Sequence, residues 1–138
     1  MQIRLMTLND YDAAIFLWKS TAGIGISDRD DSRDRIARYL ARNPSTCFVA
    51  EENGRLIGTV LAGHDGRRGF IYHAAVAHFA RGQGVGSALI ARVTDALRRE
   101  GIGKAALLAM QSNAGGNAFW EKQGFVERPD LCYRNREL

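Results

Sequence analysis

The sequence predicts a mixed α/β (α+β) fold in which helices cover both faces of a central, mostly antiparallel sheet of about seven strands. Segments with strand and helix character follow one another as strand, two helices, three strands, helix, strand, helix and two strands. The dipeptides Asn53-Gly54 and Asp65-Gly66, which favour tight hairpins, separate the three central strands and make them antiparallel. At 138 residues, the chain is expected to form one domain over 1–138.

The N-terminal third predicts one strand and two helices. Residues 2–6 alternate as a strand does, and Thr7 or Asn9 is placed to cap the helix that follows. The glycines of "TAGIGISD" end that helix, and Ser27 with the acidic residue three positions later opens a second, charged helix that ends before Pro44. The residues expected to face the core are Ile15, Phe16, Trp18, Ile36, Tyr39 and Leu40.

The last third continues with a helix of about 17 residues that starts at Val85, carries one apolar stripe and stops at Gly101. The apolar run "KAALLAM" is typical of a buried central strand, although so short a run also fits a helix. A helix over 113–123 and two closing strands, "FVER" and "LCYRNRE", are expected to complete the fold.

Composition and charge narrow the class of protein. The chain has 19 Lys and Arg against 15 Asp and Glu, and its basic residues are scattered, which suits an anionic small ligand better than a nucleic acid. Its longest apolar run is far shorter than the ~20 residues of a membrane span, and the N-terminus lacks the apolar core of a secretion signal. Cys47 and Cys132 are too few and too far apart for a disulfide framework, so we expect a cytoplasmic protein with reduced thiols.

The segment "ARGQGVGSAL" places three glycines at alternate positions directly before a helix. Such a loop leaves backbone N–H groups unpaired at the positive end of the helix dipole, where anions bind, and Arg81 can add charge-assisted hydrogen bonds. The spacing matches neither the dinucleotide-binding pattern nor the Walker loop. The alternative is a tight turn that only packs the helix against the sheet.

Two segments, "HAAVAHFARGQGVGSAL" and "NAGGNAFWEKQGF", resemble the coenzyme-A-binding signatures of the GCN5-related N-acetyltransferase (GNAT) family and occur in the family's order. The matched positions are Val76, Arg81, Gly84 and Gly86 in the first segment and Asn113, Trp120, Gly124 and Phe125 in the second. The resemblance covers residues 46–128 closely and the N-terminal third by element order alone.

This resemblance implies an acetyl-CoA-dependent N-acetyltransferase in which an acceptor amine attacks the thioester directly. The pyrophosphate of the co-substrate would bind the glycine loop, its pantetheine arm would pair with a strand, and an N–H near Val76 would stabilise the developing oxyanion. Asn113 is equally suited to cap the helix after it. The residues implied to bind acetyl-CoA are Ala74, Ala75, Val76, Arg81, Gly82, Gln83, Gly84, Val85, Gly86, Ser87, Asn113 and Trp120.

The chain departs from the family at the proton-transfer groups. Trp120 stands where a tyrosine acid is usual, while Leu108 and Phe70 occupy positions that carry a base in other branches, and none of the three transfers a proton at useful pH. Tyr72 is the remaining candidate catalytic residue; its alternative role is packing. Strand alternation predicts one face with Phe70, Tyr72, Ala74 and Val76 and the other with His73 and Ala75.

Weaker candidates are His73 and His64, which better suit a packing role in the sheet, and Tyr133 on a closing strand. No metal site is expected, because the three histidines would point in different directions. A non-catalytic module that binds acyl-CoA is the alternative function, and a nucleic-acid-binding domain is disfavoured by the scattered arginines. The acceptor, a small-molecule or peptide amine, would lie against the first two helices, the "STAGIGISD" loop and the tip between the two closing strands. Many members of the family form dimers, so the resemblance is compatible with a homodimer.

Overall fold

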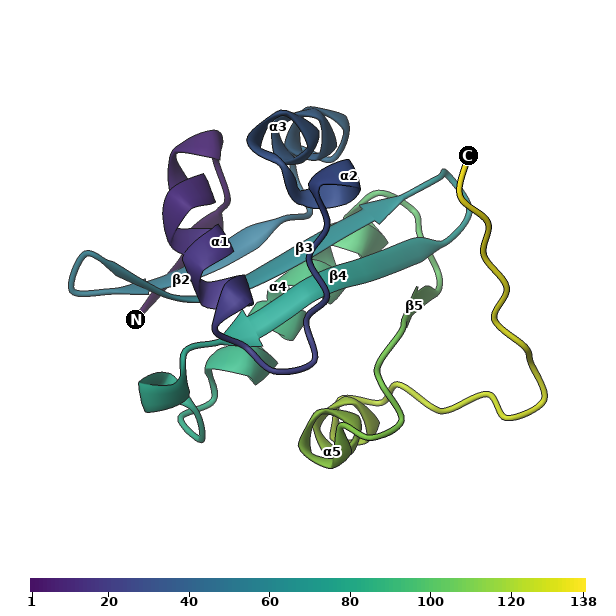
Figure 1. Cartoon of the computed structure of the whole chain (residues 1–138). Helices are drawn as coiled ribbons and strands as arrows, with labels where there is room; N and C mark the ends of the chain where they lie inside the picture. Colours follow the sequence, from purple (N-terminus) through teal and green to yellow (C-terminus); the bar gives the residue numbers. More distant parts are fainter. The chain divides into compact units, whose positions relative to one another are not determined.

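A computed structural model describes all 138 residues and divides them into two compact units, residues 1–108 and 109–138. The first unit contains a five-stranded sheet in the order β1-β2-β3-β4-β5 (Figure 1). The strands are antiparallel except for β5, which runs parallel to β4. They are β1 (Gln2–Leu5), β2 (Phe48–Glu52), β3 (Arg55–His64), β4 (Gly69–Val76) and β5 (Ala105–Leu107).

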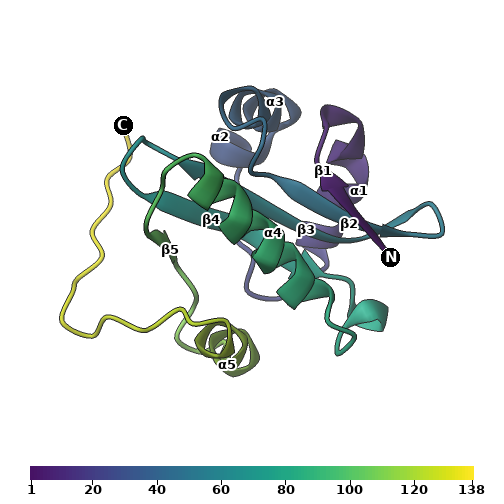
Figure 2. The same cartoon turned by 180° about the vertical axis from the view of Figure 1, so that it is seen from behind.

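Helices cover both faces of this sheet, as predicted. One face carries α1 (Tyr11–Lys19), the single turn α2 (Asp28–Asp31) and α3 (Arg33–Arg42), and the opposite face carries α4 (Val85–Arg99) (Figures 1 and 2). The second unit holds one helix, α5 (Ala114–Lys122). Short 3-10 turns, η1 (Leu8–Asp10) and η2 (His78–Ala80), precede α1 and the loop before α4.

The apolar stripe of α4 packs against β3 and β4 at close range. Two strand glycines make this approach possible, because a Cβ on Gly58 would lie 3.0 Å from Leu89 Cδ1 and a Cβ on Gly69 would lie 2.9 Å from Leu97 Cδ1. The predicted stripe is confirmed, and its buried members are Val85, Leu89, Ile90, Val93 and Leu97. The position of α4, and so of its N-terminus, is therefore set by packing against the sheet.

Both predicted hairpin turns are confirmed, between β2 and β3 and between β3 and β4. Asn53 and Gly54 have φ values of 52° and 74°, the paired left-handed conformation that a two-residue hairpin needs. In the second turn, one carboxylate oxygen of Asp65 accepts hydrogen bonds from the backbone N–H groups of Arg67 and Arg68 at 2.7 and 2.9 Å.

The two predicted closing strands are absent, and the sheet has five strands rather than seven. Residues 123–138 contain no strand, and the large apolar side chains from Val126 onward are exposed, with Val126 at 82% and Tyr133 at 66%. The run "KAALLAM" pairs over three residues only; Ala105 and Leu107 are half-buried, and its other residues are exposed. Period-2 patterning in a short, charged segment does not form a strand unless a neighbour supplies hydrogen bonds.

The N-terminal helices differ from the prediction in two ways. Phe16 is 75% exposed, because α1 buries Ala14, Leu17 and Trp18 instead. The second predicted helix is two helices, broken at Ser32, whose side chain caps α3 by accepting from the backbone N–H of Arg35. The carboxylate that accepts from the Ser27 backbone N–H, at 3.0 Å to Oδ2, belongs to Asp31 rather than Asp30; Asp30 accepts from the Ser27 hydroxyl, at 3.5 Å.

A buried carboxylate ties β1 to the start of α1. Arg4 donates two hydrogen bonds to Asp10, at 2.8 and 2.9 Å, and Asp10 also accepts from the backbone N–H of Thr7. Burial acts to raise the pKa of Asp10, but the hydrogen bonds from Arg4 and Thr7 outweigh it and hold the pKa below its ordinary value. The side chain of Asp10 is only 10% exposed, so solvent screens the pair weakly.

We expect Asp10→Asn to lower the free energy of unfolding at neutral pH by about 1–3 kcal/mol, since a neutral amide cannot accept both Arg4 hydrogen bonds. Because the folded-state pKa is depressed, this stabilisation is complete above the ordinary aspartate pKa of about 3.9 and is lost as pH falls through the lowered folded value. Urea unfolding of the wild type and the variant from pH 7 to pH 3 measures the difference. Asp12→Asn, at a position 93% exposed, should change little; a pH-independent gap for Asp10→Asn would contradict the prediction.

Candidate active site

The glycine loop leads from β4 and η2 into α4. Gly82 and Gly84 have φ values of 73° and 82°, in the left-handed region that favours glycine. A Cβ at either position would meet nothing within 4 Å, so these glycines are not needed for packing inside the chain. The left-handed conformations explain why glycine occupies both positions in a tight turn, whereas crowding by neighbouring residues does not.

The N-terminus of α4 has no side-chain cap, because its N-cap residue is Gly84. The first-turn N–H groups of a helix have no acceptor within the helix, and the N-cap glycine has no side-chain oxygen to offer them. The side chain of Val85 is buried, so this residue can offer a ligand only its backbone N–H. Arg81 is exposed and donates its Nε–H to the carbonyl oxygen of Val76 at 3.1 Å, which joins the loop to the end of β4.

The far half of β4 has a strand neighbour on one side only. β3 pairs along the strand, whereas β5 pairs only with residues 69–71. The N–H of Ala77 donates to Ile57 on the β3 side, so the N–H of Val76, one residue earlier, faces the opposite, open edge. Residues 74–76 therefore present main chain where an extended ligand could pair, next to the glycine loop.

A bulge in β4 reverses the side-chain alternation that the sequence predicts. Tyr72 pairs with Leu61 and Ala75 pairs with Thr59, so two residues of β4 oppose one of β3, and His73 has a φ of 47°. Tyr72 and Ala75 consequently share the face that α1, α2 and α3 cover, while Val76 turns toward α4. The sequence predicted that Phe70, Tyr72, Ala74 and Val76 share one face, and this is wrong for Val76. It also predicted that His73 and Ala75 lie on the face opposite Tyr72, and this is wrong for both residues.

His73 occupies this bulge, and side chains from three other elements hold it. Its Nε2 lies 2.6 Å from Oδ1 of Asp31 on α2, and its ring packs against Trp18 of α1 with 4.6 Å between centroids. Thr59 of β3 accepts from Trp18 Nε1 at 2.8 Å and donates to the His73 carbonyl at 2.9 Å. No spacing rule could find this pair, because Asp31 lies 42 residues before His73 and is brought to it only by the fold.

Tyr72 lies beside His73 and is 47% exposed. Its ring contacts Phe70 at 4.8 Å and meets Tyr39 of α3 edge to face at 6.1 Å. These three aromatic residues line a cleft of about 400 Å³ that also includes Arg42 and Arg68. Burial raises the pKa of the Tyr39 hydroxyl, which has no hydrogen-bond partner.

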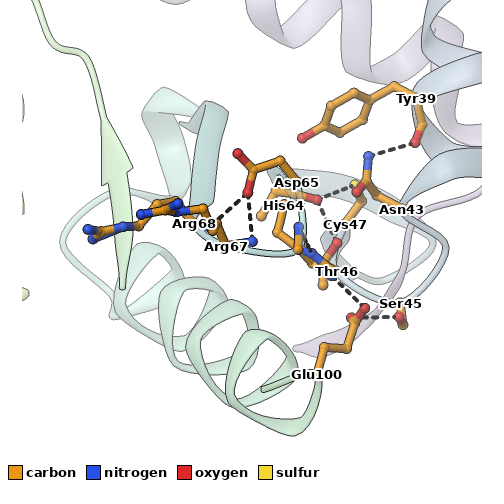
Figure 3. Close-up of polar contacts among 12 residues, drawn as sticks. Tyr39, Asn43, Ser45, Thr46, Cys47, His64, Asp65, Arg67, Arg68 and Glu100 are labelled. Carbon is orange, nitrogen blue, oxygen red and sulfur yellow. Dashed lines mark hydrogen bonds and ion pairs between the residues drawn. The ribbon is translucent and has the colours of Figure 1, made fainter. Parts of the chain in front are cut away.

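One end of the cleft is organised by polar contacts of the β3–β4 turn (Figure 3). Asp65 is occupied by the two backbone N–H groups of its own turn, and Asn43 donates to the carbonyl of Tyr39. His64 lies 2.9 Å from Glu100, which also accepts from Ser45, so His64 is a structural link to the end of α4 as expected. Arg42 and Arg68 form no ion pair, so this end of the cleft carries two uncompensated guanidinium groups.

The second unit contains two residues that the resemblance assigns to acetyl-CoA. Asn113 caps α5 by accepting from the N–H of Gly116 at 3.0 Å, which confirms its alternative role. Trp120 packs edge to face against Phe119 and Phe125 within this unit. In the first unit, Leu108 is 54% exposed.

The chain contains two free cysteines, Cys47 and Cys132. No three His, Cys, Asp or Glu side chains are grouped so that they could hold a metal ion. None of the helices has both the length and the apolar character needed to cross a membrane.

Comparison with known proteins gives consistent results. The model of the acetyltransferase (GNAT) family matches residues 11–125. An acetyltransferase from Pectobacterium atrosepticum is 34% identical over 122 residues, 88% of this chain and 85% of the relative. Ard1 from Thermoplasma volcanium has a similar fold, with a TM-score of 0.81 at 21% identity over 91% of this chain and 82% of that one. The PaiA N-acetyltransferase from Thermoplasma acidophilum, solved in complex with coenzyme A, has a TM-score of 0.77 at 17% identity over 88% and 86% of the two chains.

Proposed function

Because the chain belongs to the acetyltransferase (GNAT) family, we propose that it is an acetyl-CoA-dependent N-acetyltransferase that acetylates a primary amine of a small molecule or peptide. The observation that carries the proposal is the uncapped N-terminus of α4, where Gly82 and Gly84 adopt left-handed conformations and border open space. Backbone N–H groups so arranged bind a diphosphate. We assign them that role, with residues 1–138 acting as one domain.

The remaining contacts to acetyl-CoA follow from the same part of the fold. Arg81 would add charge to the diphosphate site, and the open edge of residues 74–76 would pair with the amide groups of the pantetheine arm. A main-chain N–H near Val76 would stabilise charge on the acetyl oxygen. Bound acetyl-CoA supplies the acetyl group as a thioester.

The acceptor amine is proposed to enter through the cleft at Tyr72, on the face covered by α1, α2 and α3. We propose that the Tyr72 hydroxyl donates a hydrogen bond beside the acetyl group, because this side chain is exposed at the end of the cleft next to the bulge. The unpaired guanidinium groups of Arg42 and Arg68 favour an acceptor that carries an anionic group besides its amine.

Calorimetry with coenzyme A, followed by a thiol-release assay with acetyl-CoA and a panel of amines, tests this function. We expect coenzyme A to bind and thiol release to depend on an amine, with turnover highest for amines that carry a carboxylate. Binding without amine-dependent release would instead support a non-catalytic acyl-CoA-binding module. Absence of binding would contradict the proposal.

We expect Arg81→Gln to weaken coenzyme A binding about tenfold, which corresponds to one charge-assisted hydrogen bond of about 1.4 kcal/mol. Calorimetry at 50 and 300 mM salt should show that the affinity for coenzyme A depends less on salt in the variant than in the wild type. Arg99→Gln removes the same charge from the exposed C-terminal end of α4 and is the matched control. Equal weakening by both variants would show that the effect is one of net charge and not of the loop.

A further inference from the structure

We propose that His73 accepts the proton of the acceptor ammonium and that Asp31 positions it for that task. The inference rests on the proposed acetyltransferase function and adds the base that the sequence does not reveal. Leu108 and Phe70 occupy the positions that hold a base in some relatives and have no group that can accept a proton.

The pair with Asp31 defines which nitrogen of His73 is available. Nε2 lies 2.6 Å from Oδ1 of Asp31, so Nε2 carries the proton of the neutral ring and donates it to the carboxylate. Nδ1 then carries the lone pair, and it has no partner in the chain. A neutral imidazole whose other nitrogen is held by a carboxylate is the form that a general base needs.

Asp31 is itself held in place from two sides. Its Oδ2 accepts from the backbone N–H of Ser27 at 3.0 Å, and its carbonyl accepts from the Tyr11 hydroxyl at 2.6 Å. Capping α2 uses only one carboxylate oxygen, so it does not account for the contact of Oδ1 with His73. The side chain of Asp31 is 6% exposed and that of His73 is 14% exposed, so the pair is shielded while the ring keeps some access.

The backbone of His73 supports the same conclusion. A φ of 47° is uncommon for a residue other than glycine, and such conformations gather at functional sites. The bulge turns the ring to the face that carries Tyr72, whose side chain lines the cleft, and it places His73 directly before the open edge of residues 74–76. An amine that enters beside Tyr72 therefore arrives next to both the imidazole and the main chain assigned to acetyl-CoA.

The proposed transfer balances as follows. The acceptor ammonium gives one proton to Nδ1 of His73 and becomes a neutral amine. Its nitrogen lone pair forms the C–N bond to the acetyl carbon, and the C–S bond breaks with its electron pair on sulfur. The second proton of the nitrogen passes to the thiolate, which leaves as the thiol of coenzyme A, and His73 releases its proton to water.

The groups that face the imidazole determine how its activity depends on pH. Asp31 from α2 is the carboxylate in contact with the ring, while Trp18 from α1 and Thr59 from β3 are neutral. Tyr11 from α1 reaches the Asp31 carbonyl, and Tyr72 is the neighbour on β4. A general base accepts a proton only in its neutral form, so the wild-type rate should rise with pH.

The kinetic test compares His73→Gln with His78→Gln, which removes an exposed histidine from the same segment. We expect His73→Gln to lower kcat at pH 7 on the order of 100-fold or more while KM for acetyl-CoA stays within about twofold. The loss should shrink as pH approaches the pKa of the amine, because the free amine then no longer needs a base. Asp31→Asn should lower kcat and shift the pH profile. Equal rates for the two histidine variants would overturn the proposal.

Nitrogen-15 spectra of the imidazole groups in the wild type give a second test, which reports the position of the ring proton in the unaltered protein. We expect His73, assigned by its loss in His73→Gln, to carry its proton on Nε2 at pH 8; a proton on Nδ1 would overturn the proposal. The two failures are distinct. Absence of thiol release from the wild type with every amine contradicts the proposed function, whereas release that survives His73→Gln contradicts only the role of His73.

Discussion

Gly84→Val should weaken coenzyme A binding on the order of 100-fold or more, a loss of about 2.7 kcal/mol. Gly84 has a φ of 82°, and a β-branched residue cannot hold this conformation without a cost above the 1–2 kcal/mol typical of L-residues. If the backbone keeps its conformation, the new side chain occupies the open space assigned to the diphosphate. If the backbone relaxes, the first-turn N–H groups of α4 turn away. Both outcomes remove the site.

Gly101→Val is the matched control for this experiment. Gly101 has a φ of 80°, meets nothing within 4 Å of an added Cβ, and follows the opposite end of the same helix. Both variants should lose similar stability in urea unfolding, but only Gly84→Val should lose coenzyme A in calorimetry. Unchanged affinity in Gly84→Val, or an equal loss in Gly101→Val, would mean that the loop does not hold the co-substrate.

Thr59→Val should lower the free energy of unfolding by about 2–5 kcal/mol, because it leaves two buried groups without partners. The Trp18 Nε1–H loses its acceptor and the His73 carbonyl loses its donor, while the shape of the side chain is preserved. Since these bonds hold the bulge, kcat for acetyl transfer should also fall, by about tenfold, with coenzyme A affinity unchanged. Urea unfolding, kinetics and calorimetry measure the three quantities.

Thr46→Val separates the two effects. Thr46 is as buried as Thr59 and donates to the carbonyl of Ala62 at 2.6 Å, but it has no link to the bulge. Its substitution should cost about 1–3 kcal/mol of stability and leave kcat as it is. A fall in kcat of the same size in both variants would attribute the effect to lost stability rather than to the position of His73.

Local rules predicted the parts of the fold that local sequence determines. The Asn-Gly and Asp-Gly turns and the apolar stripe of α4 depend on residues near one another in the chain, and all are confirmed. The closing strands were not formed, because a strand depends on a neighbour that its own residues do not encode. Phe16 was placed inside from its apolar character, yet which side of α1 is buried depends on the sheet beneath it.

The candidate site also has a part that local sequence determines and a part that depends on the tertiary fold. The glycine loop is contiguous in sequence, so its glycines could be found and their left-handed conformations explained. The pairing of His73 with Asp31 joins residues from a strand and a distant one-turn helix, and the bulge that aims the ring is a product of tertiary packing. Strand alternation assumes a regular strand and therefore placed Ala75 and Val76 on the wrong faces.

The sheet separates the layer of α1, α2 and α3 from the layer of α4. Residues that pack only within one layer do not touch those of the other, and the energetic effects of distant, unconnected substitutions are close to additive. Mutations in Tyr39, Arg42 or the "STAGIGISD" loop could therefore accumulate, in evolution or in a directed library, without disturbing the helix that carries the diphosphate site. The architecture therefore allows the layer of α1, α2 and α3 to diversify while the layer of α4 keeps the same diphosphate site.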